Sequence, residues 1–200
     1  MIGVYMSKKI AAIYIPGLGD HRPKYQDKVY LLLKLFGIEG YYFPFGWAEG
    51  NSFEAKLNEL LEMVDSLDSR GFKVNLIAAS AGASGALNAF VKRKDKIKSV
   101  ALICGKVNNL DEIGGTYFDI NPKFKQSVGI LPESLKELDS TSRARIMSIR
   151  PLRDSVVPPK DTIIEGARNL QSFTFGHSST IAHYLTVGLP RIAWWIRKNS

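Results

Sequence analysis

A serine surrounded by very small residues stands at an abrupt change of pattern in the chain. The apolar run 74–79 ends at Ser80, and the small-sided segment 81–91 follows at once. This change predicts a strand that turns sharply into a helix. Bulk two positions before or after the serine would clash with adjoining backbone at such a turn, and Ala78 and Gly82 stand there. The hydroxyl of Ser80 is therefore a candidate nucleophile.

The same turn places Ser80 beside the start of a helix, where backbone amides and the helix dipole favour developing negative charge. The amide of Ala81 would be one oxyanion donor. Segment 78–82, Ala-Ala-Ser-Ala-Gly, resembles the G-x-S-x-G motif of the α/β-hydrolase superfamily, with Ala78 in place of the first glycine. The resemblance covers residues 10–195 and implies a serine hydrolase.

A glycine turn near the N-terminus is similar to the H-G-x-G turn of the same superfamily. The strand-like run that starts at Ile10 continues into Ile-Pro-Gly-Leu-Gly-Asp at 15–20, with Pro16 where the superfamily has histidine. The resemblance implies that the amide of Leu18 is the second oxyanion donor. An ordinary glycine turn after a strand would explain these residues equally well.

An aspartate a few residues before Val-Pro resembles the acid turn of the superfamily. Segment 150–159, Arg-Pro-Leu-Arg-Asp-Ser-Val-Val-Pro-Pro, follows a strand-like run and contains Asp154. The resemblance implies that Asp154 orients a histidine and stabilises its charged form. A turn aspartate that bonds its own backbone is the alternative. Asp161 is the nearest rival, but it falls in the helix that Pro158 and Pro159 would start.

One of the three histidines occupies the loop where this fold keeps its base. His177 follows a last strand-like run over 170–176 and precedes the Ser178-Ser179 cap of the terminal helix. The resemblance makes His177 the general base. His183 lies inside a helical pattern, and His21 follows the glycine turn and would border the pocket, so both remain alternatives.

The order Ser80, Asp154, His177 is the one that the superfamily uses. Each candidate follows the carboxyl end of a predicted strand, where open parallel sheets gather their active sites. The resemblance implies cleavage of a carboxylic ester or related acyl bond in a small-molecule substrate through an acyl-serine intermediate, without a metal or organic cofactor. An acyltransferase or thioesterase with the same triad, or a weakly catalytic binding protein, are the alternatives.

Apolar runs that alternate with helical patterns predict an α/β fold in one domain, 1–200: a three-layer α/β/α sandwich around a mostly parallel sheet. Six strands are expected, at 10–16, 40–45, 74–80, 99–105, 144–149 and 172–175. Helical spacing predicts helices over 25–36, 53–67 and 81–91, the second capped by Asn51 or Ser52 and ended by Gly71.

Residues 106–142 depart from this alternation and predict a short excursion over the sheet, too small for a large cap. The part 132–139 has a helical pattern, and Tyr117, Phe118 and Phe124 would line an apolar pocket. Three lysines, Lys106, Lys123 and Lys125, suggest the hypothesis that the leaving group is anionic.

The chain contains a single cysteine, which limits the chemistry that cysteine can supply. The sole cysteine, Cys104, allows no internal disulfide, and it lies in an apolar run with no base nearby in sequence, so we expect packing rather than nucleophilic chemistry.

The N-terminus lacks a secretory pattern and no apolar segment is long enough to span a bilayer, which favours the cytoplasm. Scattered histidines disfavour a metal site, and Gly17-Leu18-Gly19 lacks the third glycine of a dinucleotide site.

A net charge of +8 raises the question of anionic partners. The densest basic group, 92–98, falls between a predicted helix and a strand, where cations stabilise the helix end, so we expect no nucleic acid partner. The segment 181–196 has Leu185, Leu189 and two tryptophans at helical spacing. We expect it to pack on the sheet rather than on a lipid surface, with Pro190 breaking or restarting the helix. The oligomeric state is open.

Overall fold

The computed structural model describes residues 9–20, 31–50 and 52–200. A six-stranded, all-parallel sheet has the order β2-β1-β3-β4-β5-β6. The strands are β1 Lys9–Ile15, β2 Glu39–Tyr42, β3 Phe72–Ala79, β4 Ile97–Ile103, β5 Ile146–Arg150 and β6 Arg168–Gln171. The α/β class, the parallel sheet and the number of strands are confirmed.

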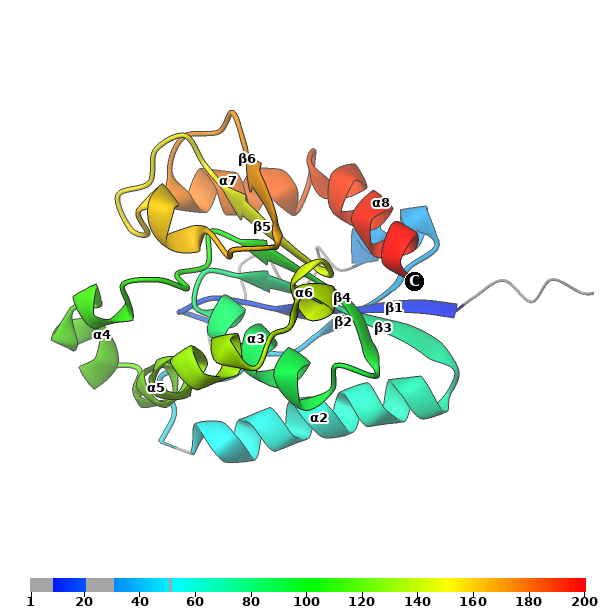
Figure 1. The fold of residues 1–200 in the computed structure, drawn as a ribbon, viewed down its shortest axis with the longest axis horizontal. Coiled ribbons are helices and arrows are strands. Elements are labelled where there is room, and N and C mark those ends of the chain that lie inside the picture. The colour runs from blue at the N-terminus through cyan, green and yellow to red at the C-terminus, as the bar shows by residue number, and fades with distance from the viewer. Residues whose placement is uncertain (1–8, 21–30, 51) are drawn as a thin grey trace, which may run out of the picture.

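Helices cover both faces of the sheet, so the described residues form three layers (Figure 1). The helices are η1 Leu33–Phe36, α2 Phe53–Ser69, α3 Gly82–Lys92, η2 Leu110–Glu112, α4 Gly115–Asp119, α5 Pro122–Lys136, α6 Ser140–Arg143, η3 Pro159–Thr162, α7 His177–Tyr184 and α8 Leu189–Asn199. None of the described helices is long and apolar enough to cross a membrane.

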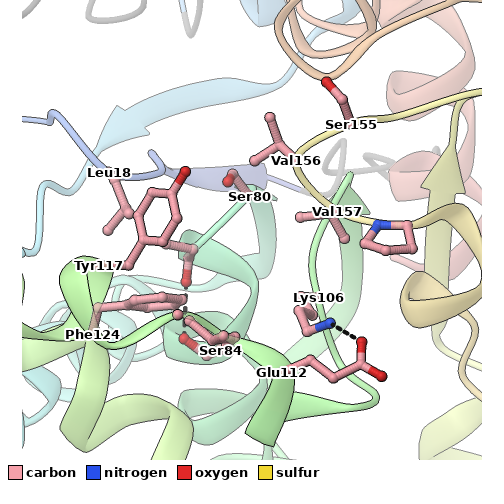
Figure 2. Close-up of a pocket in the computed structure, with 14 residues that line it drawn as sticks. Leu18, Ser80, Ser84, Lys106, Glu112, Tyr117, Phe124, Ser155, Val156 and Val157 are labelled. Atoms are coloured by element: carbon pink, nitrogen blue, oxygen red, sulfur yellow. Dashed lines mark hydrogen bonds and ion pairs between the residues drawn. The ribbon is translucent and has the colours of Figure 1, made fainter.

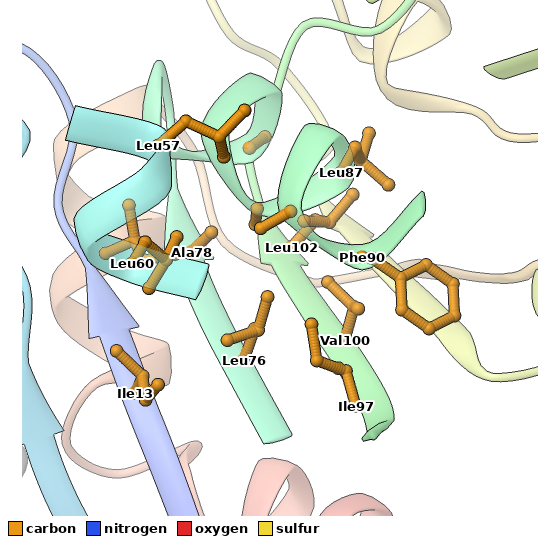
Figure 3. Packing of buried hydrophobic residues seen from close by; sticks show 14 of the residues in the cluster. Ile13, Leu57, Leu60, Leu76, Ala78, Leu87, Phe90, Ile97, Val100 and Leu102 are labelled. Carbon is orange, nitrogen blue, oxygen red and sulfur yellow. The ribbon is translucent and has the colours of Figure 1, made fainter. Parts of the chain in front are cut away.

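Alternate residues of the central strands supply two separate cores, as expected for a sheet buried on both faces. On one face, Leu76 and Ala78 of β3 pack against Leu57 and Leu60 of α2 and against α3 (Figure 3). On the other face, Ile77 and its neighbours pack against α7, α8 and η1. Because all six strands are parallel, their carboxyl ends lie along one edge of the sheet.

The terminal helical segment belongs to the second core. Leu185, Leu189 and Trp195 are buried there, and α8 starts at Leu189 with Pro190 in its first turn. Trp194 is half exposed and lies under the guanidinium of Arg168. Packing against the sheet, rather than insertion into lipid, therefore accounts for the apolar stripe of this segment.

The helix boundaries agree with the sequence only in part. Ser52 caps α2 by accepting a bond from the Ala55 amide at 3.1 Å, whereas Asn51 lies outside the described residues. Of the helix expected over 25–36, residues 25–30 are outside the described part, and the end of it is the 3-10 helix η1, terminated by Gly37 at a φ of 69°. The helix expected over 132–139 is present only in part: residues 132–136 form the end of α5, which begins ten residues earlier at Pro122 and contains Pro132.

The last strand was also misplaced. β6 covers 168–171, and residues 172–175 continue only as an isolated bridge between Arg153 and Phe175. Ser172 accepts bonds from the amide and the hydroxyl of Thr174, and these local bonds bend the chain out of the regular ladder. Likewise β2 ends at Tyr42, because Phe43 and Phe45 leave the sheet to pack beside Trp47 and Phe53.

The excursion 106–142 lies on the helical layer rather than across the sheet. Its longest helix, α5, packs against α3, and the short helix α4 stands beside it (Figure 1). Asn88 of α3 donates to the carbonyl of Ser127 at 3.0 Å, and Ser127 donates to Ser84 at 2.8 Å. The excursion thus forms one wall near the carboxyl edge of the sheet without forming a large cap.

Candidate active site

The turn after β3 holds Ser80 in a strained backbone conformation. Its φ is 50°, in the left-handed region of backbone conformation that residues other than glycine rarely adopt. The Ser80 amide donates to Ile103 at 2.9 Å, and its carbonyl accepts from Ala83 at 3.0 Å, which ties the turn to β4 and to the first turn of α3. The turn points the hydroxyl of Ser80 away from the edge of the sheet. The small residues around Ser80 led to the prediction of such a turn.

Small residues at this turn are required by close backbone approach. A Cβ at Gly82 would stand 2.4 Å from the carbonyl oxygen of Ile15, and one at Gly17 would stand 2.8 Å from the Cβ of Ser80. The ends of β1 and β3 therefore touch at the point where the strand order reverses, which is where open α/β sheets form a ligand crevice.

Replacing Gly82 by alanine is expected to lower the free energy of unfolding by about 1 to 3 kcal/mol, because backbone must shift to admit the methyl group. The matched control is Gly129→Ala in α5, where an added Cβ meets nothing within 4 Å and helix propensity favours alanine. Urea unfolding of both variants measures the difference. Equal stability of Gly82→Ala and the parent would contradict the packing argument.

The structure brings the three side chains singled out in the sequence into one hydrogen-bonded chain. Nε2 of His177 lies 2.9 Å from Oγ of Ser80, and Nδ1 lies 2.8 Å from Oδ2 of Asp154. The other carboxylate oxygen of Asp154 accepts the amides of Val156 at 2.8 Å and Val157 at 3.0 Å. The carboxylate is fully buried, so its orientation is held from two sides.

The residues considered as alternatives to Asp154 and His177 have other partners or lie outside the described residues. Asp161 is fully buried in η3 and binds Lys106 and Asn109, and these bonds hold the pKa of Asp161 below its usual range although burial acts to raise it. The His183 ring packs edge-on against Tyr184. His21 lies outside the described residues.

The two amides considered as oxyanion donors border the same cavity as the serine. Leu18, Ser80 and Ala81 all line a cavity of about 260 Å³. Among the hydrogen bonds between described residues, none has the Leu18 or Ala81 amide as its donor. The geometry leaves both N–H groups available to an acceptor in the cavity.

Apolar side chains dominate the cavity wall. Figure 2 shows Leu18 and Tyr117 on one side of Ser80, with Val156 and Val157 on the other. Phe124 also lines the cavity, as expected, whereas Phe118 packs against Phe124.

The lysine hypothesis is corrected at two positions. Lys123 is fully buried and donates to the carbonyls of Phe45 and Gly46 at 3.1 and 3.0 Å, and Lys125 is exposed outside the cavity lining. Lys106 lines the cavity but already pairs with Asp161 and Glu112. Among the described residues that line the cavity, no cation is therefore without a carboxylate partner.

Sequence patterns missed the groups that hold the glycine turn. Asp20 accepts the amide of Gly46 at 2.7 Å and that of Trp47 at 3.3 Å, and the Trp47 indole donates to the carbonyl of Pro16. Burial raises the pKa of Asp20 although these amides oppose the shift. Through Gly46, the buried Lys123 ties α5 to the same turn. The only signal for these contacts in the sequence was the position of Asp20 directly after the glycine turn.

Cys104 follows β4 and lies beneath the histidine, where its Sγ is 3.9 Å from the carbonyl oxygen of His177. Potential ligand atoms of Cys104, Asp154 and His177 lie within 4.8 Å of one another, the one such group in the described part of the chain. Burial and then the charge of Asp154 raise the pKa of the thiol to about 12. A protonated thiol beside a hydrogen-bonded pair fits poorly as a metal ligand set.

The raised pKa predicts an unreactive thiol in the folded protein. At about pH 8 the Cys104 thiolate is scarcely populated, so we expect iodoacetamide to leave the native chain unmodified and to alkylate the chain in urea. Intact mass measures both states. Equal labelling rates with and without urea would show that the burial is not maintained.

Comparison with known proteins agrees with this architecture. No family model and no curated protein sequence matches the chain. Among solved structures, a monoacylglycerol lipase from Paleococcus ferrophilus is similar over 95% of both chains, with 16% identity and a TM-score of 0.67. Est1E from Butyrivibrio proteoclasticus, solved with ferulic acid bound, is similar over 96% of this chain and 90% of its own, with 15% identity and a TM-score of 0.71.

A third similar structure is alpha/beta hydrolase domain-containing protein 10 from mouse, with 14% identity over 95% of this chain and 90% of its own, at a TM-score of 0.63. The protein therefore has the α/β-hydrolase fold. Lipases and esterases are among its structural neighbours, and hydrolase chemistry is compatible with this scaffold, which hosts many reactions.

Proposed function

We propose that the protein is a serine hydrolase that cleaves a carboxylic ester, with Ser80 as nucleophile, His177 as general base and Asp154 as the orienting acid. The hydrogen-bonded chain from Asp154 through His177 to a serine with a φ of 50° carries the proposal. A nucleophile bonded to a base, with the base bonded to a third group, is the arrangement that activates a hydroxyl.

In the proposed reaction, Nε2 of His177 removes the proton of Ser80 as Oγ attacks the ester carbonyl. The amides of Leu18 and Ala81 stabilise the oxyanion, and the imidazolium returns its proton to the departing alkoxide. The alcohol leaves and an acyl-serine remains. Water, deprotonated by the same histidine, then releases the carboxylic acid and regenerates Ser80. No metal or organic cofactor takes part.

The cavity favours a short, uncharged acyl group. Its wall is mostly apolar, and the one lysine among the described residues of its lining, Lys106, is paired with two carboxylates. Removing a carboxylate substrate from water without a free cation to pair with it would be costly. We therefore expect neutral esters to be better substrates than anionic ones.

A fluorophosphonate, which phosphorylates activated serines, tests the proposal directly. The parent chain is expected to gain one adduct by intact mass, and Ser80→Ala is expected to gain none. Ser84→Ala is the matched control, because Ser84 lines the same cavity but bonds to the carbonyl of Ala81 and to Ser127 rather than to a histidine. No adduct on the folded parent would favour a non-catalytic binding protein, and an adduct that survives in Ser80→Ala would assign another nucleophile.

A further inference from the structure

Two loops beside His177 expose large apolar side chains to solvent. Phe173 is 91% exposed and Phe175 is 63% exposed. The loops after β5 and β6 run next to each other (Figure 1), because the Leu152 amide donates to the Thr174 carbonyl at 3.0 Å. Thr174 turns inward to bond Thr180 at 2.7 Å. The two phenylalanines on either side of Thr174 remain exposed to solvent.

The loop after β5 also reaches the cavity. Val156 is half exposed and lines the cavity beside Ser80 (Figure 2), and Leu152 is exposed on the same loop. We call Leu152, Val156, Phe173 and Phe175 the apolar rim. Scattered apolar residues are ordinary on protein surfaces, but several exposed apolar side chains on two adjacent loops, one of which lines a cavity, are typical of a binding surface.

Two exposed cations lie on or directly after the loop that follows β5. Arg153, directly across the bridge from Phe175, and Lys160 are exposed. Within residues 151–161 the two carboxylates, Asp154 and Asp161, are buried and paired with His177 and Lys106, whereas Glu165 is exposed. Residues 166–200 contain no aspartate or glutamate. An apolar surface flanked by exposed cations is complementary to a lipid bilayer whose interior is apolar and whose headgroups are anionic.

We propose that the apolar rim docks on the surface of an anionic lipid bilayer and so opens the cavity toward esters held in that bilayer. The docking rests on the rim and its charges, whereas the delivery of substrate rests on the function proposed above. A second copy of this chain is a poorer occupant, because two molecules of net charge +8 repel one another.

Vesicles of phosphatidylglycerol and phosphatidylcholine, compared with vesicles of phosphatidylcholine alone, test the docking by co-sedimentation. The double variant Phe173→Ser/Phe175→Ser is expected to bind the anionic vesicles at least about tenfold more weakly than the parent. Leu35→Ser is the matched control, because Leu35 is 78% exposed on η1, away from the site. Arg153→Gln is expected to weaken binding to anionic vesicles and to leave the weak binding to neutral vesicles unchanged.

Three outcomes would overturn the proposal: no sedimentation of the parent, full binding by the double variant, or an equal loss in Leu35→Ser. A dimer seen by light scattering that the double variant dissociates would reassign the rim to self-association. Ser80→Ala is expected to bind vesicles as the parent does. The docking and the proposed esterase activity can therefore fail independently: loss of the fluorophosphonate adduct leaves the vesicle result standing, and the reverse also holds.

Discussion

His177→Ala is expected to reduce kcat for hydrolysis of a neutral ester by about 10⁴- to 10⁶-fold, because the hydroxyl of Ser80 loses the base 2.9 Å away. The residual rate would come from the cavity and the two oxyanion amides. Steady-state kinetics, with circular dichroism to show that the variant is folded, measures the effect.

His183→Ala supplies a control on the same helix. Its ring packs against Tyr184 and has no part in the hydrogen-bonded chain, so kcat should remain close to that of the parent. If His183→Ala lost as much activity as His177→Ala, the base would be misassigned or α7 would be disrupted by either change.

Asp154→Asn is expected to lower kcat by about 10⁴-fold while leaving the fold intact. The amides of Val156 and Val157 bind one carboxylate oxygen and would hold the asparagine oxygen in that place. The asparagine NH₂ would then donate to Nδ1 of His177 and leave the proton on Nε2. Nε2 would face Ser80 as a donor, so it could not accept the proton of the hydroxyl.

Asp161→Asn provides the contrast. Its carboxylate is fully buried against Lys106 and lies outside the hydrogen-bonded chain, so the change should lower the thermal midpoint more than it lowers kcat. Measuring kcat and the thermal midpoint for both variants separates the two roles. A large loss of kcat with no loss of stability in Asp161→Asn would make it the functional acid.

Several features followed from short stretches of sequence. The strand, the small residues and the helix around Ser80 are local patterns, and the close contact of Gly82 with Ile15 explains why they are small. Alternation of apolar runs and helical patterns indicated a parallel sheet, because strands buried on both faces need continuous apolar sequence. Asp154 and His177 were chosen because their segments resemble the acid turn and the histidine loop of the α/β-hydrolase superfamily, and both follow predicted strands, whose carboxyl ends meet at one edge of a parallel sheet.

Errors arose where local signals competed with distant packing. Pro132 suggested a helix start, but α5 begins at Pro122 because the packing of its buried face against α3 continues through Pro132. The apolar pair Phe173 and Phe175 suggested a strand, yet local bonds of Ser172 and Thr174 end β6 at Gln171 and leave both rings exposed. Lys123 resembled a surface cation but is buried beneath Phe45 and Gly46.

The sequence by itself determined the fold class and the candidate nucleophile, because these depend on periodicity and on contacts between near neighbours, and the resemblance to the α/β-hydrolase superfamily supplied the other two candidates and their order. Only the tertiary structure decided which groups meet across the chain. The bond between Ser80 and His177 joins residues 97 positions apart, and that between Lys123 and Gly46 joins residues 77 apart. Such contacts depend on strand order and helix packing, which no local pattern encodes.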